Sequence, residues 1–549
     1  MKFKLLVLPL VLSGTFSFGQ TFGPNITGNT ETNFQYLQPD STIGAIQPSE
    51  KSTLNSYTNV NYSYKKFRAG ARFESYLPHT LGYPNRYSGS GIGYKYISYT
   101  NKMIEVTLGN FYEQFGSGMI FRSYESRALG IDNALDGVKL IFNPVPGAQI
   151  KTIYGSPRFS FDNGKLVNSD GIIRGVDATI DFGEFYKLLA DSKFKATIGG
   201  SFVSKNQKAF HPQYNMPNNV GAYGARAKLK YGRFYLSGEH VIKEQDPSND
   251  NAFIFNYGHG TYVTAGYSQK GLGIVLSAKS IDNMSFRADP NALLTDLNIN
   301  FLPALTKAHT YNLAATLYPY ATQPQGEIAF QGDIFYKIKK KTPLGGKYGT
   351  TINVNFAIAF APNRDVSNND PTQRVLYETG VFDMSDSLFH RDFNIEIKKK
   401  INKKMKLGVK YFNFRFNNDI NIVTKEAHGY IDSHIGVIDF SYKFNRKHSL
   451  RAEIQGLFTE QDRGNWGTVL LEYNVSPSWF VSVLDQYNYG HTDASKRIHY
   501  LTVSGGYLFG SSRFILTYGK QREGIFCVGG ICRPVPATNG LTLTFTSSF

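Results

Sequence analysis

The sequence is poor in several features that define common protein classes. Its 549 residues include two cysteines and two tryptophans, and nowhere does a run of 18 apolar residues occur. A helical membrane protein is therefore excluded. The chain also lacks a Gly-x-Ser-x-Gly motif between a strand and a helix, and no two of its 11 histidines stand at ligand spacing. We therefore expect no enzyme, no metal site and no cofactor.

The two cysteines, Cys527 and Cys532, enclose the short sequence Val-Gly-Gly-Ile. Such a pair serves either as a metal or redox pair or as a disulfide that fixes a short loop. No further cysteine and no nearby histidine could complete a metal site. We therefore predict a disulfide, which suits an oxidising compartment.

The N-terminus has the pattern of a secretory signal peptide. Two lysines precede an apolar run from Leu5 to Leu12, and a small-x-small cleavage site ends at Gly19. The apolar run is too short to cross a membrane as a helix. We predict a signal peptide over residues 1–19 and a single β-barrel over residues 20–549.

Strand-like alternation recurs along the mature chain. In residues 327–337, for example, Ile328, Phe330 and Ile334 share one face, and the polar residues between them share the other. Segments of about 10 residues with this pattern are long enough to cross a bilayer as tilted strands. The sequence also carries 36 tyrosines and 42 phenylalanines, whose rings suit both membrane interfaces. The pattern predicts an all-β transmembrane barrel.

The last residues resemble the terminal strand of a bacterial outer-membrane barrel. Leu541, Leu543 and Phe545 alternate with small polar residues, and the chain ends on Phe549. In such barrels the assembly machinery recognises this strand, so we expect that machinery as a partner. The strand also places the C-terminus in the periplasm and thereby orients every other strand.

Turn lengths predict a single antiparallel barrel with short periplasmic turns and long extracellular loops. Thirteen strands counted forward end at residue 284 and include one long strand over 103–125. Thirteen more, counted backward from the C-terminus, end with strands 308–318 and 293–301. The sequence therefore predicts about 26 strands, within a range of 22–26.

The net charge of +17 concentrates at the expected periplasmic turns. A secreted, alternating chain makes nucleic acid an improbable partner. The lysines either keep the strand ends soluble or form a rim that docks an acidic partner or attracts anions by electrostatic steering. This candidate basic rim comprises Lys65, Lys66, Lys339, Lys340, Lys341, Lys399, Lys400, Lys403 and Lys404.

The densest group of mixed charges lies in residues 109–137, where Gly116-Ser117-Gly118 interrupts the strand pattern. Charges inside a barrel form either an ion-pair lattice that stiffens the wall or a constriction that selects solutes. A carboxylate pair for glycoside hydrolysis is a remote third interpretation. The candidate lumen charges are Glu113, Arg122, Glu125, Arg127, Asp132 and Asp136.

Several segments together resemble a family of Bacteroidota outer-membrane proteins that carries a domain-of-unknown-function label. They are residues 64–78 with Leu81-Gly-Tyr83, Gly109-Asn-Phe-Tyr-Glu-Gln-Phe-Gly116, residues 298–304 with 318–324, and Tyr473-Asn-Val-Ser-Pro-Ser-Trp479. The resemblance covers nearly the whole mature chain. It implies a barrel in the outer membrane, and it brings neither a substrate nor catalytic residues.

These observations predict an integral protein of the Gram-negative outer membrane, in contact with its lipid. A barrel of this size encloses a wide lumen that inward-folded loops or a partner must fill; the candidate segments are 111–136, 156–171, 205–219 and 361–388. We expect a pore or transport channel for polar or anionic solutes. The alternative is a structural or accessory subunit of a larger outer-membrane secretion or assembly complex, and a barrel-embedded lipid hydrolase is a distant third.

Overall fold

The computed structural model describes residues 25–186, 191–208, 211–366, 377–420 and 428–549. The predicted signal peptide lies outside these residues, as do parts of the connections 205–219 and 361–388. Within the described ranges, the longest helix has five residues. Accordingly, none of the helices there has the length and apolar character needed to cross a membrane.

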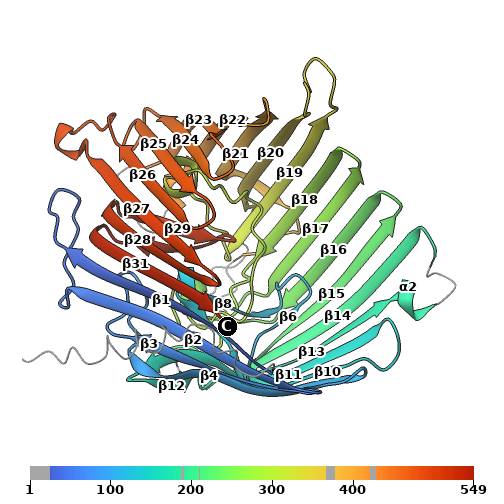
Figure 1. Cartoon of the computed structure of the whole chain (residues 1–549). Coiled ribbons are helices and arrows are strands. Elements are labelled where there is room, and N and C mark those ends of the chain that lie inside the picture. The colour runs from blue at the N-terminus through green and yellow to red at the C-terminus, as the bar shows by residue number, and fades with distance from the viewer. Residues whose placement is uncertain (1–24, 187–190, 209–210, 367–376, 421–427) are drawn as a thin grey trace, which may run out of the picture.

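Twenty-four antiparallel strands form one closed barrel, and β12 (Lys165–Asn168) is an extra strand that pairs with β11 (Figure 1). The barrel strands are β1 (Ile26–Gln38), β2 (Ser52–Tyr64), β3 (Phe67–Tyr76), β4 (Gly89–Thr100), β5 (Ile104–Phe111), β10 (Leu135–Phe142), β11 (Ala148–Asp162), β13 (Ile172–Asp181), β14 (Phe194–Asn206), β15 (Asn219–Tyr231), β16 (Phe234–Lys243), β17 (Gly258–Gln269), β18 (Leu272–Asp282), β19 (Gly326–Ile338), β20 (Thr350–Pro362), β21 (Met384–Lys400), β22 (Met405–Asn417), β23 (Tyr430–Lys443), β24 (His448–Phe458), β25 (Trp466–Val475), β26 (Trp479–Tyr487), β27 (His499–Phe509), β28 (Ser512–Gln521) and β31 (Thr538–Ser548).

The remaining elements are short and lie in connections between barrel strands. They are β6 (Glu113–Phe115), β7 (Phe121–Ser123), β8 (Glu125–Ser126), η1 (Arg127–Leu129), β9 (Ile131–Asp132), α2 (Phe182–Phe185), η3 (Asn249–Asn251), α3 (Asn312–Thr316), η4 (Asn418–Ile420), η5 (Ala494–Lys496), β29 (Gly524–Val528) and β30 (Ile531–Val535).

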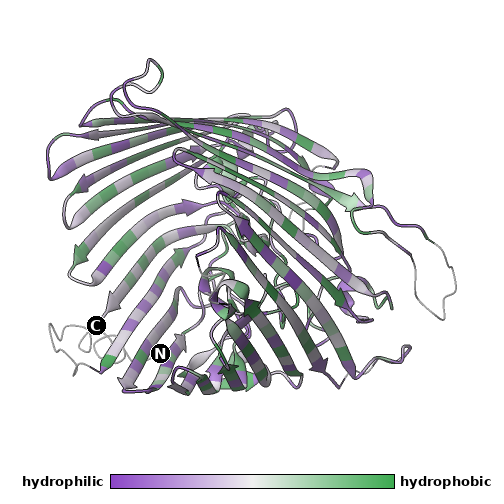
Figure 2. Cartoon of the chain, turned by 90° about the vertical axis from the view of Figure 1, so that its right-hand side faces the viewer, coloured by the Kyte–Doolittle hydropathy of each residue, from purple (hydrophilic) through white to green (hydrophobic). Residues whose placement is uncertain are grey.

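The alternation of the sequence becomes an inside and an outside of the barrel wall. On β25, Val469 and Leu471 face outward and are each 46% exposed, whereas Thr468 faces the lumen and is 1% exposed. Figure 2 shows the same change of hydropathy from residue to residue along many strands. An apolar outer face over nearly the whole wall is what a membrane-spanning barrel requires.

The first and last strands close the barrel. Their register runs from the pair Asn29–Ser548 to the pair Gln38–Asn539. Just beyond it, Gly28 and Phe549 exchange two backbone hydrogen bonds of 2.8 and 2.9 Å. Because the barrel has no free edge, each of its 24 strands lies between two partners. We call the end of the barrel with this pair and the tight turns the short-turn end, and the opposite end the long-loop end.

The 24 strands of the barrel lie within the predicted range of 22–26 but are two fewer than the central estimate of 26, and the reason for the difference lies in one connection. The expected strands 293–301 and 308–318 are wrong, because residues 283–325 leave the wall and fold into the lumen. The apolar side chains of the alternating pattern in this segment pack against apolar residues of the inner wall. The polar side of the pattern bonds to backbone: the Asn300 amide donates to the carbonyls of Met119 and Met284. The single strand expected over 103–125 is also wrong, since β5 ends at Phe111.

The closing pair yields a test with a matched control. A Cβ atom added at Gly28 would lie 2.5 Å from the Asn59 carbonyl oxygen and 2.4 Å from the Phe549 ring, whereas one added at Gly436 would meet nothing within 4 Å. We expect Gly28→Val to strain the closure by roughly 1–3 kcal/mol and lower the temperature at which the folded band disappears in semi-native electrophoresis. Gly436→Val should melt like the unchanged protein. Equal melting of both variants would contradict this role of Gly28.

Candidate functional site in the barrel lumen

Three connections at the long-loop end fold into the barrel (Figure 1). We name them the first inward segment (112–134), the second inward segment (283–325) and the third inward segment (522–537). The first was among the segments expected to fill the lumen. The second was missed, because its alternation was interpreted as strands. The third contains the cysteine pair and was not among the segments expected to fill the lumen.

The first and second inward segments share an apolar core with one side of the wall. Phe115 and Phe121 of the first segment pack with Phe286 and Ile299 of the second, and all four side chains are at most 1% exposed. The wall contributes inward-facing apolar residues to the same core, namely Ile153, Ile173, Val203, Val220, Val241 and Ile281. A water-filled barrel interior is normally polar. These wall residues therefore mark a dry contact.

The second inward segment crosses the lumen to the opposite wall. There Leu313 and Tyr318 belong to a second apolar cluster, together with the wall residues Phe412, Phe414, Phe416, Ile431, Ile435 and Trp466. Tyr320 of the same cluster donates its hydroxyl to Glu327 Oε2 at 2.7 Å. Burial raises the pKa of Tyr320 well above its usual value, so the phenol stays protonated and remains a donor. One segment thus ties the two halves of the wall together.

Three buried lysines of the wall hold the backbone of the second inward segment. The Nζ atoms of Lys205, Lys243 and Lys279 donate to the carbonyl oxygens of Arg287, Ser285 and Pro303, at 2.7, 2.5 and 2.7 Å. Each lysine side chain is fully buried. Asp246 lies 2.6 Å from Lys205 and 3.5 Å from Lys243, and Glu327 lies 2.7 Å from Lys279. Carboxylate partners make such deep burial of ammonium groups tolerable.

A buried ion cluster holds the first inward segment. The Arg158 guanidinium lies 2.6 Å from Glu74 and 2.8 Å from Asp132, and Arg72 bonds to the same two carboxylates. Arg72 and Glu74 belong to β3 and Arg158 to β11, whereas Asp132 belongs to the segment. Two cations and two anions balance, and the forked guanidiniums fit the paired carboxylate oxygens. The cluster fixes the segment to two strands of the wall.

The structure brings four of the six predicted lumen charges into ion pairs. Glu125 lies 2.7 Å from Arg127 and 3.1 Å from Arg72, and Asp132 belongs to the buried ion cluster. Arg127 also reaches Glu31, at 2.8 Å. These contacts join the segment to β1 and β3.

The other three candidates are Glu113, which is the fourth candidate in an ion pair, Arg122, and Asp136 on β10. Glu113 lies 2.8 Å from Lys151 of β11. Arg122 stacks between the rings of Tyr124 and Phe301, at 4.5 and 4.3 Å. Asp136 lies apart on the outward face of β10, where it accepts a hydrogen bond from Asn168 at 3.0 Å.

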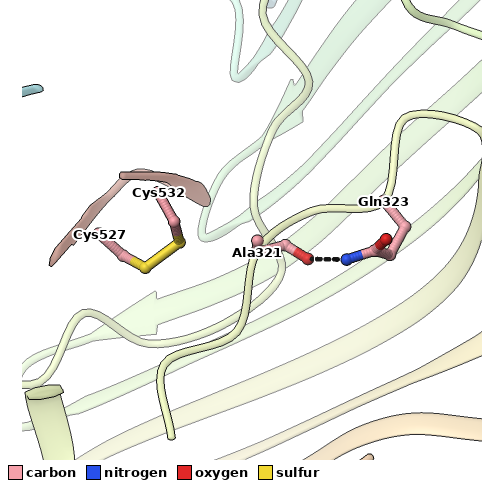
Figure 3. Close-up of a disulfide and its surroundings, with 4 residues drawn as sticks. All are labelled: Ala321, Gln323, Cys527 and Cys532. Atoms are coloured by element: carbon pink, nitrogen blue, oxygen red, sulfur yellow. Dashed lines mark hydrogen bonds between the residues drawn. A yellow bond between two sulfur atoms is a disulfide. The ribbon is translucent and has the colours of Figure 1, made fainter. Parts of the chain in front are cut away.

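The third inward segment is a disulfide-closed hairpin that lies against the other two. Cys527 and Cys532 face each other across β29 and β30 and form the disulfide, close to Ala321 and Gln323 of the second segment (Figure 3). The Gly530 carbonyl accepts from the Thr322 amide at 3.0 Å. Arg533 Nε donates to the carbonyl of Ala128 in the first segment at 2.8 Å. The hairpin therefore contacts both other segments.

Two cavities remain between the inward segments and the short-turn end. The first, of about 640 Å³, is lined by Asn29, Thr30, Glu31, Asn59, Asn61, Arg72, Tyr94, Tyr112, Glu125, Arg127, Ser511, Thr546, Ser547 and Ser548. The second, of about 710 Å³, includes Lys102, Gln114, Gln149, Lys151, Asp177, Asp181, Glu184, Arg226 and Lys228 in its lining. Both linings mix the two charge signs with neutral polar groups. Neither cavity contains a cluster of metal ligands among the described residues.

The candidate basic rim lies at the short-turn end. Lys65 and Lys66 form the turn from β2 to β3, and the other lysines lie in or beside the connections from β19 to β20 and from β21 to β22. Lys399 is half-buried and the others are exposed. The rim therefore follows part of the short-turn end, and none of its lysines lines either cavity.

The lysine contacts yield a second test. Lys279→Met removes the cation from a fully buried Glu327, and a broken buried pair costs about 3–5 kcal/mol. We expect faster hydrogen exchange at the amides of Ile299 and Phe301, which donate to the carbonyls of Phe286 and Gly118. Lys337→Met, at an exposed position of β19, is the control and should leave exchange unchanged. Identical exchange in both variants would argue that Lys279 does not hold the segment.

None of the curated proteins matches this chain in sequence. Similar solved structures include the siderophore receptor PirA from Pseudomonas aeruginosa, with 10% identity and a TM-score of 0.41 over 96% of this chain and 80% of that chain. The outer membrane protein opdK from Pseudomonas aeruginosa has 9% identity and a TM-score of 0.35 over 84% of this chain and 99% of that chain. For OccAB3 from Acinetobacter baumannii the values are 9% and 0.34, over 96% and 99%. The expected origin in Bacteroidota stays a prediction. A family model, "Family of unknown function (DUF6029)", matches residues 1–549, and the chain therefore belongs to this family.

Proposed function

We propose that the protein is an outer-membrane channel for polar solutes that its own inward segments close at rest. The observation that supports this most directly is the filled lumen, in which three segments of one chain pack against the inner wall. An open barrel of 24 strands would breach the permeability barrier of the membrane. Because the segments that fill the lumen belong to the same chain, their movement could open and close the channel, as expected for a gated channel.

The two cavities support a solute class. Both linings offer carboxylates, guanidiniums, amides and hydroxyls. The first is mostly polar, whereas the second adds ammonium groups and also includes apolar residues such as Met103, Val145 and Ile198. The first cavity has two arginines and two glutamates, so its formal charges cancel. Polar solutes of low net charge fit such linings better than strongly anionic ones, since a selective anion path needs an excess of one sign.

Removal of the second inward segment tests the proposal. Asp282 and Gly326 are directly paired across β18 and β19, so a short glycine-rich turn can join them without disturbing the wall. In planar bilayers we expect small or rare conductance steps from the unchanged protein and large, stable steps from the shortened one. Heat-modifiable migration of both proteins would verify that the barrel has folded.

Equal conductance of the two proteins would refute the closure role. Because deletion also removes apolar partners of the wall, a milder variant supports the test. Phe286→Ala leaves the chain length unchanged and removes a fully buried ring from the shared core. We expect it to raise the frequency of openings without reaching the conductance of the shortened protein.

The alternative function, a subunit of a larger outer-membrane complex, is favoured by the distribution of charge at the short-turn end. The connections at residues 339–349, 398–406 and 443–448 follow one another around the barrel, and they contain many lysines or arginines without a single acidic residue. Such an arc attracts an acidic surface by electrostatic steering.

Gentle detergent extraction tests this alternative. We expect a partner to co-purify at low salt, to dissociate as the ionic strength rises, and to be lost from a variant with Lys339, Lys340 and Lys341 changed to Gln. A variant with Lys65 and Lys66 changed to Gln, on a different part of the rim, is the control. A lone barrel at every salt concentration would remove the alternative.

A further inference from the structure

The outer wall carries a polar patch whose neighbours in register on both sides are apolar. The patch lies on the outward face of β21, β22 and β23 and consists of Arg391, Asn413, Arg415, Asp432 and His434. These residues face outward because they alternate with buried lumen residues such as Asp392, Phe414 and Ser433. In register beside the patch stand Ile358 on β20 and Phe458 on β24. We call this patch the exterior arginine cluster.

The cluster is connected by hydrogen bonds and ring contacts. Arg391 donates to Asn413 Oδ1 at 3.1 Å, and the Arg415 guanidinium lies 4.7 Å from the centre of the Tyr430 ring. His434 Nδ1 bonds to the Tyr411 hydroxyl at 2.7 Å. The arrangement holds both guanidiniums beside neutral polar groups.

The two arginines oppose each other directly across β21 and β22. Like charges at directly opposite positions of neighbouring strands repel and destabilise a sheet. The carboxylate of Asp432 lies 3.9 Å from Arg415, and the two side chains are 43% and 39% exposed, so this pair offsets little of the repulsion. Counting His434 as neutral, the cluster keeps one excess positive charge. An anion between the two guanidiniums would relieve the repulsion.

The height of the cluster indicates where such an anion comes from. Lys399, near the short-turn end of β21, lies eight positions after Arg391, which corresponds to about 20 Å along the barrel axis for a tilted strand. The outward residues between them, Phe393, Ile395 and Ile397, are apolar. The apolar band of such barrels is about 25 Å tall. The cluster therefore lies near the edge of this band on the long-loop side, where long arginine side chains reach the headgroups of that leaflet.

We propose that the exterior arginine cluster binds the phosphate group of an anionic lipid in that leaflet. Two guanidinium forks match the geometry of phosphate oxygens, and the amide of Asn413 adds a donor. The apolar wall on both sides accommodates the acyl chains. Basic patches on membrane proteins bind lipid phosphates in this way. The site lies outside the lumen and serves anchoring or lipid recruitment, separate from solute passage.

Lipid binding by the purified protein tests the proposal. Delipidated protein in detergent is titrated with lipid A, with dephosphorylated lipid A and with inorganic phosphate, and native mass spectrometry counts the bound molecules. We expect lipid A to bind at least tenfold more tightly to the unchanged protein than to Arg391→Gln/Arg415→Gln. Arg415→Lys, which keeps the charge and loses the fork, should be intermediate.

Arg174→Gln is the matched control, because Arg174 is an outward arginine on β13 that faces Ser204 rather than a second arginine. It should bind lipid A as the unchanged protein does. Removal of charge from a lipid-facing surface does not harm insertion, so the double variant should fold, and heat-modifiable migration checks this. Undiminished binding by the double variant, equal binding of the dephosphorylated lipid, or equal occupancy by inorganic phosphate would each overturn the proposal.

Discussion

Backbone hydrogen bonding in a solvent without donors or acceptors is the constraint on which this structure depends. In a bilayer each unpaired N–H or C=O group costs several kcal/mol, so a spanning sheet must close on itself. The pairing of β1 with β31, completed by Gly28 and Phe549, satisfies that requirement. Because β1 and β31 pair in antiparallel orientation, the number of barrel strands must be even, and both chain ends lie at the same end of the barrel. The division into a short-turn end and a long-loop end follows as well.

Closure creates a second problem, since a barrel of this size encloses more space than its wall side chains occupy. The chain solves it with connections that already exist. Apolar residues at inward positions of the wall, such as Phe412 and Val203, receive apolar residues of the inward segments. Buried ions, such as Lys279 with Glu327 and Arg158 with Glu74, then fix the position of each segment. Apolar contacts stabilise the packing of the segments but do not define their orientation, because the hydrophobic effect is non-directional. The ion pairs define the position of each segment relative to the wall.

Much of the wall is predictable from the sequence, because period-two alternation is a local property that each strand displays by itself. The predicted fold class is confirmed, and the 24 strands lie within the predicted range of 22–26. The two surplus strands of the central estimate come from a segment in which alternation serves another purpose. In residues 293–301 the apolar Ile299 alternates with the polar Asn300, as it would on a strand. The Asn300 amide instead donates hydrogen bonds to backbone carbonyls within the lumen. A signal for the missed second segment was present on β22. Its outward residues Val409 and Tyr411 and its inward residues Phe412 and Phe414 are all apolar or aromatic, which a wall facing water on one side does not need.

The site itself was only partly predictable. The charges of residues 109–137 stand out by density, and four of them form ion pairs, but their partners Arg72 and Arg158 lie far away along the chain. The three lysines that hold the second inward segment belong to three different strands, and nothing local distinguishes them from surface lysines. Such contacts depend on which strands curve toward each other, and that follows from the closed topology rather than from any short motif.

The second inward segment is joined to the wall at both of its ends, through neighbouring strands whose boundary residues Asp282 and Gly326 are paired. A separately folded plug domain could swing away as a unit and leave the whole bore free. The second inward segment cannot move away in this manner, because it has a fixed length and both of its ends remain attached to the wall beside the opening. Under the proposed function, the length of this segment limits how far it can move toward the wall, and this distance sets an upper limit on the width of the solute that can pass.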